Sequence, residues 1–153
     1  MSLFTGFAEL RTPADLLLKL EHDIKRMSEN TSDEYAAFDF FVTAEHVVDW
    51  LHSGFHAKRE REALRQSDPL LQITSHIANG AKHFTAGASH HKSVAAIERG
   101  KYADDYADDY ADGPIFINFS EGEVAVLACD QIDAITLAYR VLAYWQHKLA
   151  NVA

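Results

Sequence analysis

The chain of 153 residues contains a single cysteine, Cys129. One cysteine excludes a disulfide within the chain and is typical of proteins from reducing compartments. The sequence has no apolar run of about 18 residues or more, so we expect no membrane-spanning helix. The first residues, MSLFTGFAELRTP, lack a basic segment followed by an apolar one, so we expect no signal peptide. These absences predict a cytoplasmic protein without a membrane partner.

The sequence also has little concentrated positive charge and no complete catalytic motif. Its formal net charge is −9, and glutamates interrupt its most basic stretch, residues 58–65. Nucleic-acid binding is therefore not expected, because proteins that bind phosphate backbones usually carry a basic surface. No phosphate-binding loop, dinucleotide fingerprint or nucleophile elbow is present. Cys129 has no identifiable base partner, and a buried, inert thiol is the simpler interpretation. The pattern favours a protein that is not an enzyme.

Amphipathic helices dominate what is present. The length suits one domain. Thr12-Pro13 and Asp68-Pro69 each place a capping residue before proline, and Thr31-Ser32-Asp33-Glu34 resembles a capping box. Apolar residues then recur at helical spacing, and Asp130, with Asp133 three residues later, is the predicted cap of the last helix. The predicted helices span about 13–29, 32–54, 69–86 and 130–150, so the expected fold is mainly α and resembles a four-helix bundle.

A β-prone region separates the third and fourth long helices. Runs at 93–98, 115–119 and 124–128 predict a small antiparallel ribbon within about 92–128, with a hairpin at 120–123. Between the first two runs, at 101–113, the unit Tyr-Ala-Asp-Asp repeats. This segment is interpreted as an acidic loop. An alternative is a cation-binding loop, although it lacks the spacing of an EF-hand; its carboxylates are Asp104, Asp105, Asp108, Asp109 and Asp112.

Histidines are concentrated in the middle of the chain, where seven of nine lie between His46 and His91. On the helix 32–54, Glu45, Asp49 and His52 share one stripe, which His56 extends. Carboxylates and imidazoles on one stripe are suitable ligands for a divalent metal such as zinc, iron or manganese. The alternative is that this stripe is the polar side of an amphipathic helix.

The helix 69–86 carries a second polar stripe, formed by Gln72, His76, Asn79 and His83. His76, Asn79 and His83 are the candidate catalytic residues, because imidazole is a common acid–base group. They are too far apart along one helix to act on a single metal ion, so groups from elsewhere, such as His46 or His52, have to join them. A hydrogen-bonded structural histidine is the alternative at each position.

The segments YAAFDFFVTAEHVVDWL (35–51) and ITSHIANGAKHF (73–84) together resemble small bacterial helical-bundle proteins of the HEPN type. The resemblance covers roughly 12–87 and 130–150. It implies a helical bundle, dimerisation, and kinship with RNase toxins or their inactive relatives. The family's signature is an arginine, a polar residue and a later histidine. Here Asn79 stands in place of the arginine before His83, and Val141 stands in place of the polar residue between Arg140 and His147, so the motif is not intact.

Three functions follow as hypotheses. The first is association through a protein interface, most simply as a homodimer. The second is a histidine- or metal-dependent hydrolase, such as an RNase, with its site on the polar faces of helices 32–54 and 69–86. The third is an acidic inhibitor of a nucleic-acid-binding protein, suggested by the net charge and the Asp-rich loop.

Overall fold

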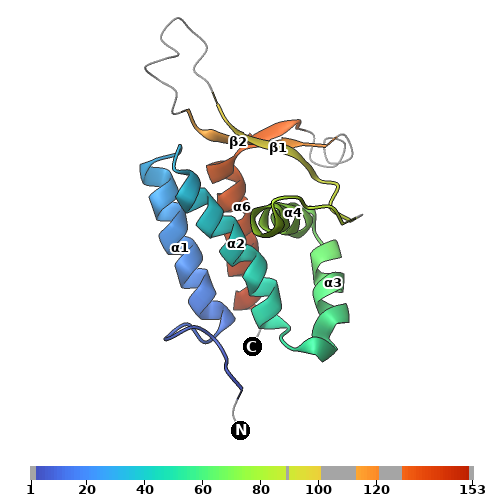
Figure 1. Cartoon of the computed structure of the whole chain (residues 1–153). Coiled ribbons are helices and arrows are strands. Elements are labelled where there is room, and N and C mark those ends of the chain that lie inside the picture. Colours follow the sequence, from blue (N-terminus) through green and yellow to red (C-terminus); the bar gives the residue numbers. More distant parts are fainter. Residues whose placement is uncertain (1–2, 89, 101–112, 121–128, 152–153) are drawn as a thin grey trace, which may run out of the picture.

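The computed structural model describes residues 3–88, 90–100, 113–120 and 129–151, and it confirms a mainly helical fold with a small antiparallel sheet (Figure 1). In chain order the elements are α1 (Pro13–Glu29), α2 (Glu34–Leu51), the 3₁₀ turn η1 (Phe55–Ala57), α3 (Lys58–Gln66), α4 (Pro69–His83), β1 (Val94–Arg99), β2 (Ile115–Phe119), β3 (Gln131–Asp133) and α6 (Ala134–Ala150). The acidic loop expected at 101–113 lies outside the described residues except for Gly113.

Side-chain caps set where the helices begin. At α1 the Asp15 amide donates to Thr12 Oγ1 (3.2 Å) and the Thr12 amide donates to Asp15 Oδ2 (2.9 Å), which is a complete capping box. This helix has the predicted bounds. The second helix is shorter than predicted at both ends. Asp33 caps its start, accepting from the Ala36 amide at 3.0 Å, and the helix ends at Leu51.

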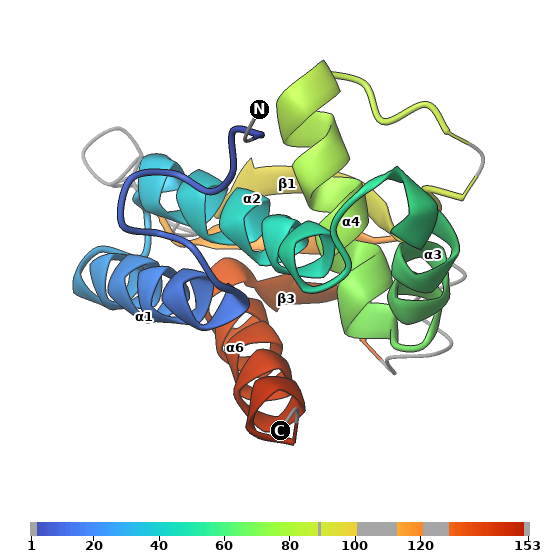
Figure 2. The same cartoon turned by 90° about the horizontal axis from the view of Figure 1, so that it is seen from below.

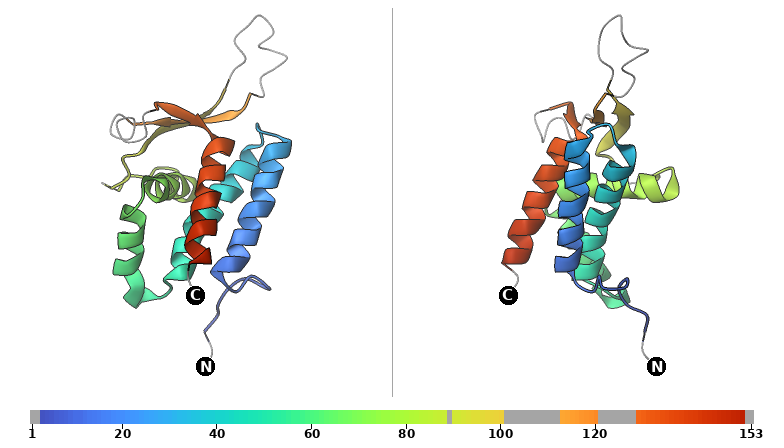
Figure 3. Two further views of the ribbon diagram at one scale, coloured as in Figure 1. Left: turned by 180° about the vertical axis from the view of Figure 1, so that it is seen from behind. Right: turned by 90° about the vertical axis from the view of Figure 1, so that its left-hand side faces the viewer.

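The helices form a bundle that the sheet covers at one end. Figures 1 and 3 show α1, α2 and α6 running alongside one another, with the sheet across their upper ends. Helix α4 crosses this group, and α3 packs against α4 (Figure 2). Among the described residues, no helix is long and apolar enough to cross a membrane.

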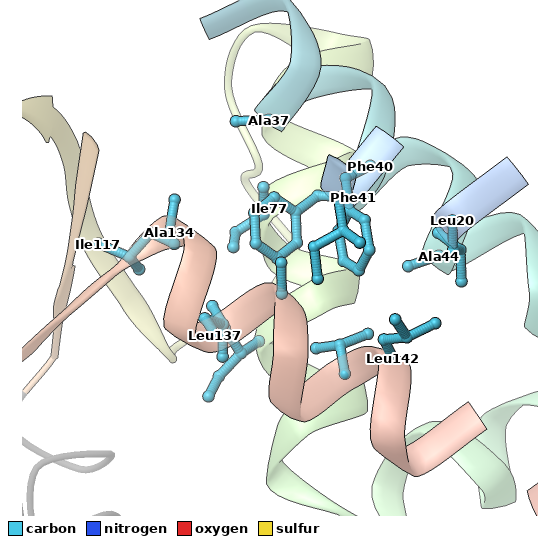
Figure 4. Close-up of a cluster of buried hydrophobic side chains, with 14 of the residues drawn as sticks. Leu20, Ala37, Phe40, Phe41, Ala44, Ile77, Ile117, Ala134, Leu137 and Leu142 are labelled. Atoms are coloured by element: carbon cyan, nitrogen blue, oxygen red, sulfur yellow. The ribbon is translucent and has the colours of Figure 1, made fainter. Parts of the chain in front are cut away.

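One hydrophobic core joins the helices to the sheet. Figure 4 shows Phe40 and Phe41 of α2 beside Leu137 and Leu142 of α6, with Ile117 of β2 nearby. The largest side chains without solvent exposure, all below 2% of their full area, include Trp145, Phe40, Leu20, Leu71, Ile73 and Leu137. The described elements therefore pack around a shared interior, with Cys129 half-buried against it.

The sheet has the order β1-β2-β3, and both pairings are antiparallel. Ile117 in the central strand lies opposite Ile97 on one side and Ile132 on the other. The predicted partner of β2, the run 124–128, lies outside the described residues together with most of the hairpin. Within the described part β2 pairs instead with β3, over residues that the pattern assigned to the start of the last helix. Asp133, rather than Asp130, caps that helix.

Three aromatic residues are exposed although their spacing continues the apolar stripes of the helices predicted at 32–54, 69–86 and 130–150: Phe55 (86%), Phe84 (97%) and Tyr139 (51%). Phe55 follows the end of α2 and so leaves its apolar face. Helix α4 ends at His83, three residues earlier than predicted, and Phe84 has a φ of 65°, which directs the chain away from the helix. On α6 the buried face is centred on Ala138 and Val141, so Tyr139 lies at its margin.

Candidate functional site

A polar cleft of about 990 Å³ lies between α2, α3, α4 and the segment that follows α4. The polar stripes predicted on the second and third long helices both contribute to it. Its lining residues are Phe38, Val42, Glu45, His46, Asp49, Glu62, Arg65, Gln66, Gln72, Ser75, Ala78, Asn79, Lys82, His90 and His91. Pockets of this size are typical of small-molecule sites, and the many ionisable side chains suit acid–base chemistry.

Arg65 of α3 bridges two carboxylates of α2 in this cleft. Its Nε atom donates to Glu45 Oε1 at 2.6 Å, and its Nη2 atom donates to Asp49 Oδ1 at 3.0 Å. The planar guanidinium is well suited to such a two-point contact. Nothing in the sequence pattern marked Arg65, because the segment 57–67 has no motif and its pairing with α2 depends on tertiary structure.

Glu45 is the most strongly buried carboxyl group of the cleft, with 8% of the residue exposed. No described residue forms a well-oriented hydrogen bond with its Oε2 atom. The pKa of Glu45 is raised from 4.5 to about 7, chiefly by burial; Arg65 and the Ser75 hydroxyl oppose the rise, and the charge of Asp49 adds to it. Glu45 can therefore exchange a proton close to neutral pH, which suits a general acid or base.

The structure does not assemble the predicted metal site. Glu45 and Asp49 face Arg65, whereas His52 ends α2 and its backbone oxygen accepts from Arg61 Nη1 at 2.7 Å. The described part of the chain contains no group of three or more histidine, cysteine, aspartate or glutamate side chains placed to hold a metal ion. The stripe is thus divided between an ion-pair network and a helix end.

Three histidines converge beside the cleft. The rings of His76 and His91 stack with centroids 5.2 Å apart, and the His90 ring lies 4.0 Å from that of His91. The Val94 amide donates to His76 Nδ1 at 3.0 Å, so the neutral ring carries its proton on Nε2. Burial is the main cause that lowers the pKa of His76, and it lowers that of His91 to about 4, with the neighbouring histidines adding to the effect.

The structure separates the candidate catalytic residues of α4. Asn79 lines the polar cleft and its Nδ2 atom donates to the Ser75 backbone oxygen at 2.8 Å. His76 lines a different cavity on the sheet side of the helix. His83 is exposed and lines neither. The residues that do converge with His76 are His90 and His91, which the helical pattern could not relate to it because they follow the end of α4.

The second cavity is an apolar groove of about 540 Å³ between α2, α4 and the sheet. Phe38, 52% exposed, lines both the groove and the polar cleft. Phe84 and Ile97, 97% and 49% exposed, also line the groove. Its remaining lining is mostly small or aliphatic: Ala37, Phe41, Ile77, Gly80, Ala81, Ala86, Val94, Ala95, Ala96, Ile115, Ile117 and Ala134, with Glu34, His76, Glu98 and Arg99 as polar members.

Comparison of the chain with models of protein families, with curated proteins and with solved structures finds no match. The resemblance to HEPN-type proteins therefore stays a prediction from the residues that carry it. The polar cleft and the apolar groove are the two features of the described structure from which function can be inferred, and they suggest different activities.

Proposed function

We propose that this protein acts in the cytoplasm through self-association, as a homodimer joined along the face that surrounds the apolar groove. The observation that carries the proposal is the exposure of Phe38, Phe84 and Ile97 around one groove. Large apolar side chains grouped on a surface mark protein interfaces, because water contact with them is unfavourable. Aromatic residues in particular are enriched at the centres of such interfaces.

The strand beside the groove supports the same proposal. Within the described residues β1 pairs only with β2, so its outer edge is open. Four of its six residues are exposed. An open edge offers backbone amides and carbonyls to another strand, and two identical edges can pair antiparallel about a two-fold axis. A second copy of the chain then covers the groove and the edge together.

Light scattering on the purified full-length chain tests this proposal. The wild type is expected to show about twice the 17.1 kDa of one chain. Phe84→Ser removes an anchor from the rim of the groove, and Ile97→Lys places a charge on the edge strand, so both variants are expected to shift the mass toward the monomer. Leu18→Ser is the matched control, because Leu18 is 64% exposed on α1 and lines neither cavity.

A wild type that remains monomeric throughout the accessible concentration range contradicts the proposal. An equal loss of mass in Leu18→Ser and Phe84→Ser also contradicts it, since the effect then does not depend on the groove. Melting temperatures measured in parallel distinguish loss of association from loss of fold.

Acid–base catalysis in the polar cleft is a second candidate function. The observation that favours it is the buried Glu45 carboxyl, whose pKa of about 7 allows it to give or take a proton at neutral pH. A hydrolase needs such a group to activate water or protonate a leaving group. The third hypothesis, an acidic inhibitor, depends on the net charge of the whole chain and on the repeat at 102–112. The repeat lies outside the described residues.

A further inference from the structure

The polar cleft contains an excess of basic groups at one wall. Lys82 of α4 lines the cleft and makes no ion pair within the described structure. His90 and His91 line it from the segment after the helix. The Asn79 side chain lies on the same helix face, one turn before Lys82. This wall therefore offers a primary ammonium group, two imidazoles and an amide.

The carboxylates of the cleft are already engaged elsewhere. Arg65 bridges Glu45 and Asp49. The third carboxylate, Glu62, lies 3.9 Å from the Lys58 ammonium group. None of these ion pairs includes Lys82 or a histidine, so the basic wall has no counter-ion among the described residues.

The basic neighbours of His91 oppose a positive charge on its ring. Burial is the main cause of its lowered pKa, and the charges of His90, His76 and Arg65 each lower it further. His90 also lowers the pKa of His76. Every charged neighbour that acts on His91 therefore disfavours a further positive charge. These neighbouring basic groups attract an anion at the same place, whereas burial, the main cause of the lowered pKa, does not favour one.

We propose that the polar cleft binds the anionic group of a small molecule, a phosphate or a carboxylate, in the space bordered by Lys82, His90 and His91. Lys82 supplies the permanent charge, and the imidazole N–H groups supply directed hydrogen bonds. The cleft, at about 990 Å³, is much larger than one such group, so the rest of the ligand extends toward Gln72 and Arg65. This inference does not depend on self-association; it gives a ligand class to the second candidate function.

Bound anion and protonated imidazole stabilise each other, which provides a direct measurement. Histidine ring resonances are followed by NMR during pH titrations of the full chain in chloride, in inorganic phosphate and in acetate at equal ionic strength. Phosphate or acetate is expected to raise the pKa of His91 from about 4 by about one unit, which by linkage means about tenfold tighter binding to the charged ring. If only one of the two anions has this effect, that anion is the one the cleft prefers.

Paired variants test whether the wall itself is responsible. Lys82→Met removes the ammonium charge but keeps most of the side chain. It is expected to weaken binding about tenfold for whichever anion, phosphate or acetate, raises the pKa of His91. Lys25→Met is the matched control, because Lys25 is exposed on α1 and does not line the cleft. His90→Gln, which keeps an N–H donor, is expected to weaken binding less than Lys82→Met does.

Two results overturn the inference. One is that chloride shifts the histidine resonances as much as phosphate and acetate do, which reports screening alone. The other is that Lys82→Met and Lys25→Met weaken binding equally, which reports the net charge of the chain and no particular site. Neither result bears on the mass measured by light scattering, so failure here is distinguishable from failure of the dimer proposal.

Discussion

The buried carboxyl group of Glu45 makes a quantitative prediction about the pH dependence of stability. Its pKa is about 7 in the folded chain and near 4.5 when it is exposed to water. The folded state therefore holds a proton between these pH values that the unfolded state releases. Because the folded state binds more protons, stability must decrease as the pH rises through this interval and then level off above about 7.

The magnitude follows from the interval between the two pKa values. One unit of difference between the folded-state and unfolded-state pKa corresponds to about 1.36 kcal/mol. The contribution of Glu45 to the free energy of unfolding therefore falls by about 3 kcal/mol between pH 4.5 and 7.5. The residue is 8% exposed, so solvent screening reduces this figure little. The pairing with Arg65 is already included, since its charge lowers the pKa while burial raises it more strongly.

Urea unfolding at a series of pH values measures this contribution, with the fluorescence of the buried Trp145 as the signal. Other groups titrate in the same range, so the quantity of interest is the difference between wild type and Glu45→Gln, a variant that cannot ionise at this position. The wild type is expected to lose about 3 kcal/mol relative to the variant. Glu62→Gln, at an exposed carboxyl of the same cleft, is the control and is expected to show no such slope.

Parallel pH profiles for wild type and Glu45→Gln would refute the reasoning, because they mean that Glu45 has the same pKa in both states. A difference that grows in favour of the wild type as pH rises would refute it more strongly. That outcome requires the attraction of Arg65 to exceed the cost of burying the carboxylate, which then has a lowered pKa.

Two further substitution pairs test the fold by urea unfolding. Phe40→Ala is expected to cost about 3–5 kcal/mol, because Phe40 has no exposed area and the cavity remains, whereas Phe4→Ala at a 91% exposed position is expected to cost less than about 0.5 kcal/mol. Asp133→Ala removes the acceptor of the Thr136 amide and is expected to cost about 1 kcal/mol, whereas Asp130→Ala is expected to cost less than about 0.5 kcal/mol. Equal losses within the first pair contradict the burial of Phe40, and equal losses within the second contradict the cap at Asp133.

Local chemistry explains which parts of the fold could be predicted. The bounds of α1 follow from the Thr12–Asp15 capping box and from apolar spacing, both of which act within one or two helical turns. The mainly helical class follows from the same signals repeated. The start of α6 illustrates the limit, because the local pattern predicts Asp130 as the cap, whereas Asp133 is the cap in the structure. Pairing of residues 131–133 with β2 decides between them, and that pairing joins segments whose contact no local pattern reveals.

The candidate site was predictable only as separate halves. Helical periodicity groups Glu45 with Asp49 on one face and Gln72 with Asn79 on another, and both faces do line the polar cleft. Periodicity within a helix cannot show that two faces oppose each other, since the crossing angle of α2 and α4 depends on the whole core. It also cannot include residues outside regular helices, which is why His90 and His91 were not joined to His76.

Arg65 shows why the chemistry of the site needed the tertiary structure. With an arginine between them, Glu45 and Asp49 are partners in an ion-pair network and not ligands waiting for a metal. The same arginine leaves Lys82 and the histidines as the basic groups without a carboxylate partner, which changes the expected ligand from a cation to an anion. The sign of the ligand's charge is thus determined by a contact between α2 and α3. The periodicity of neither helix reveals that the two pack together.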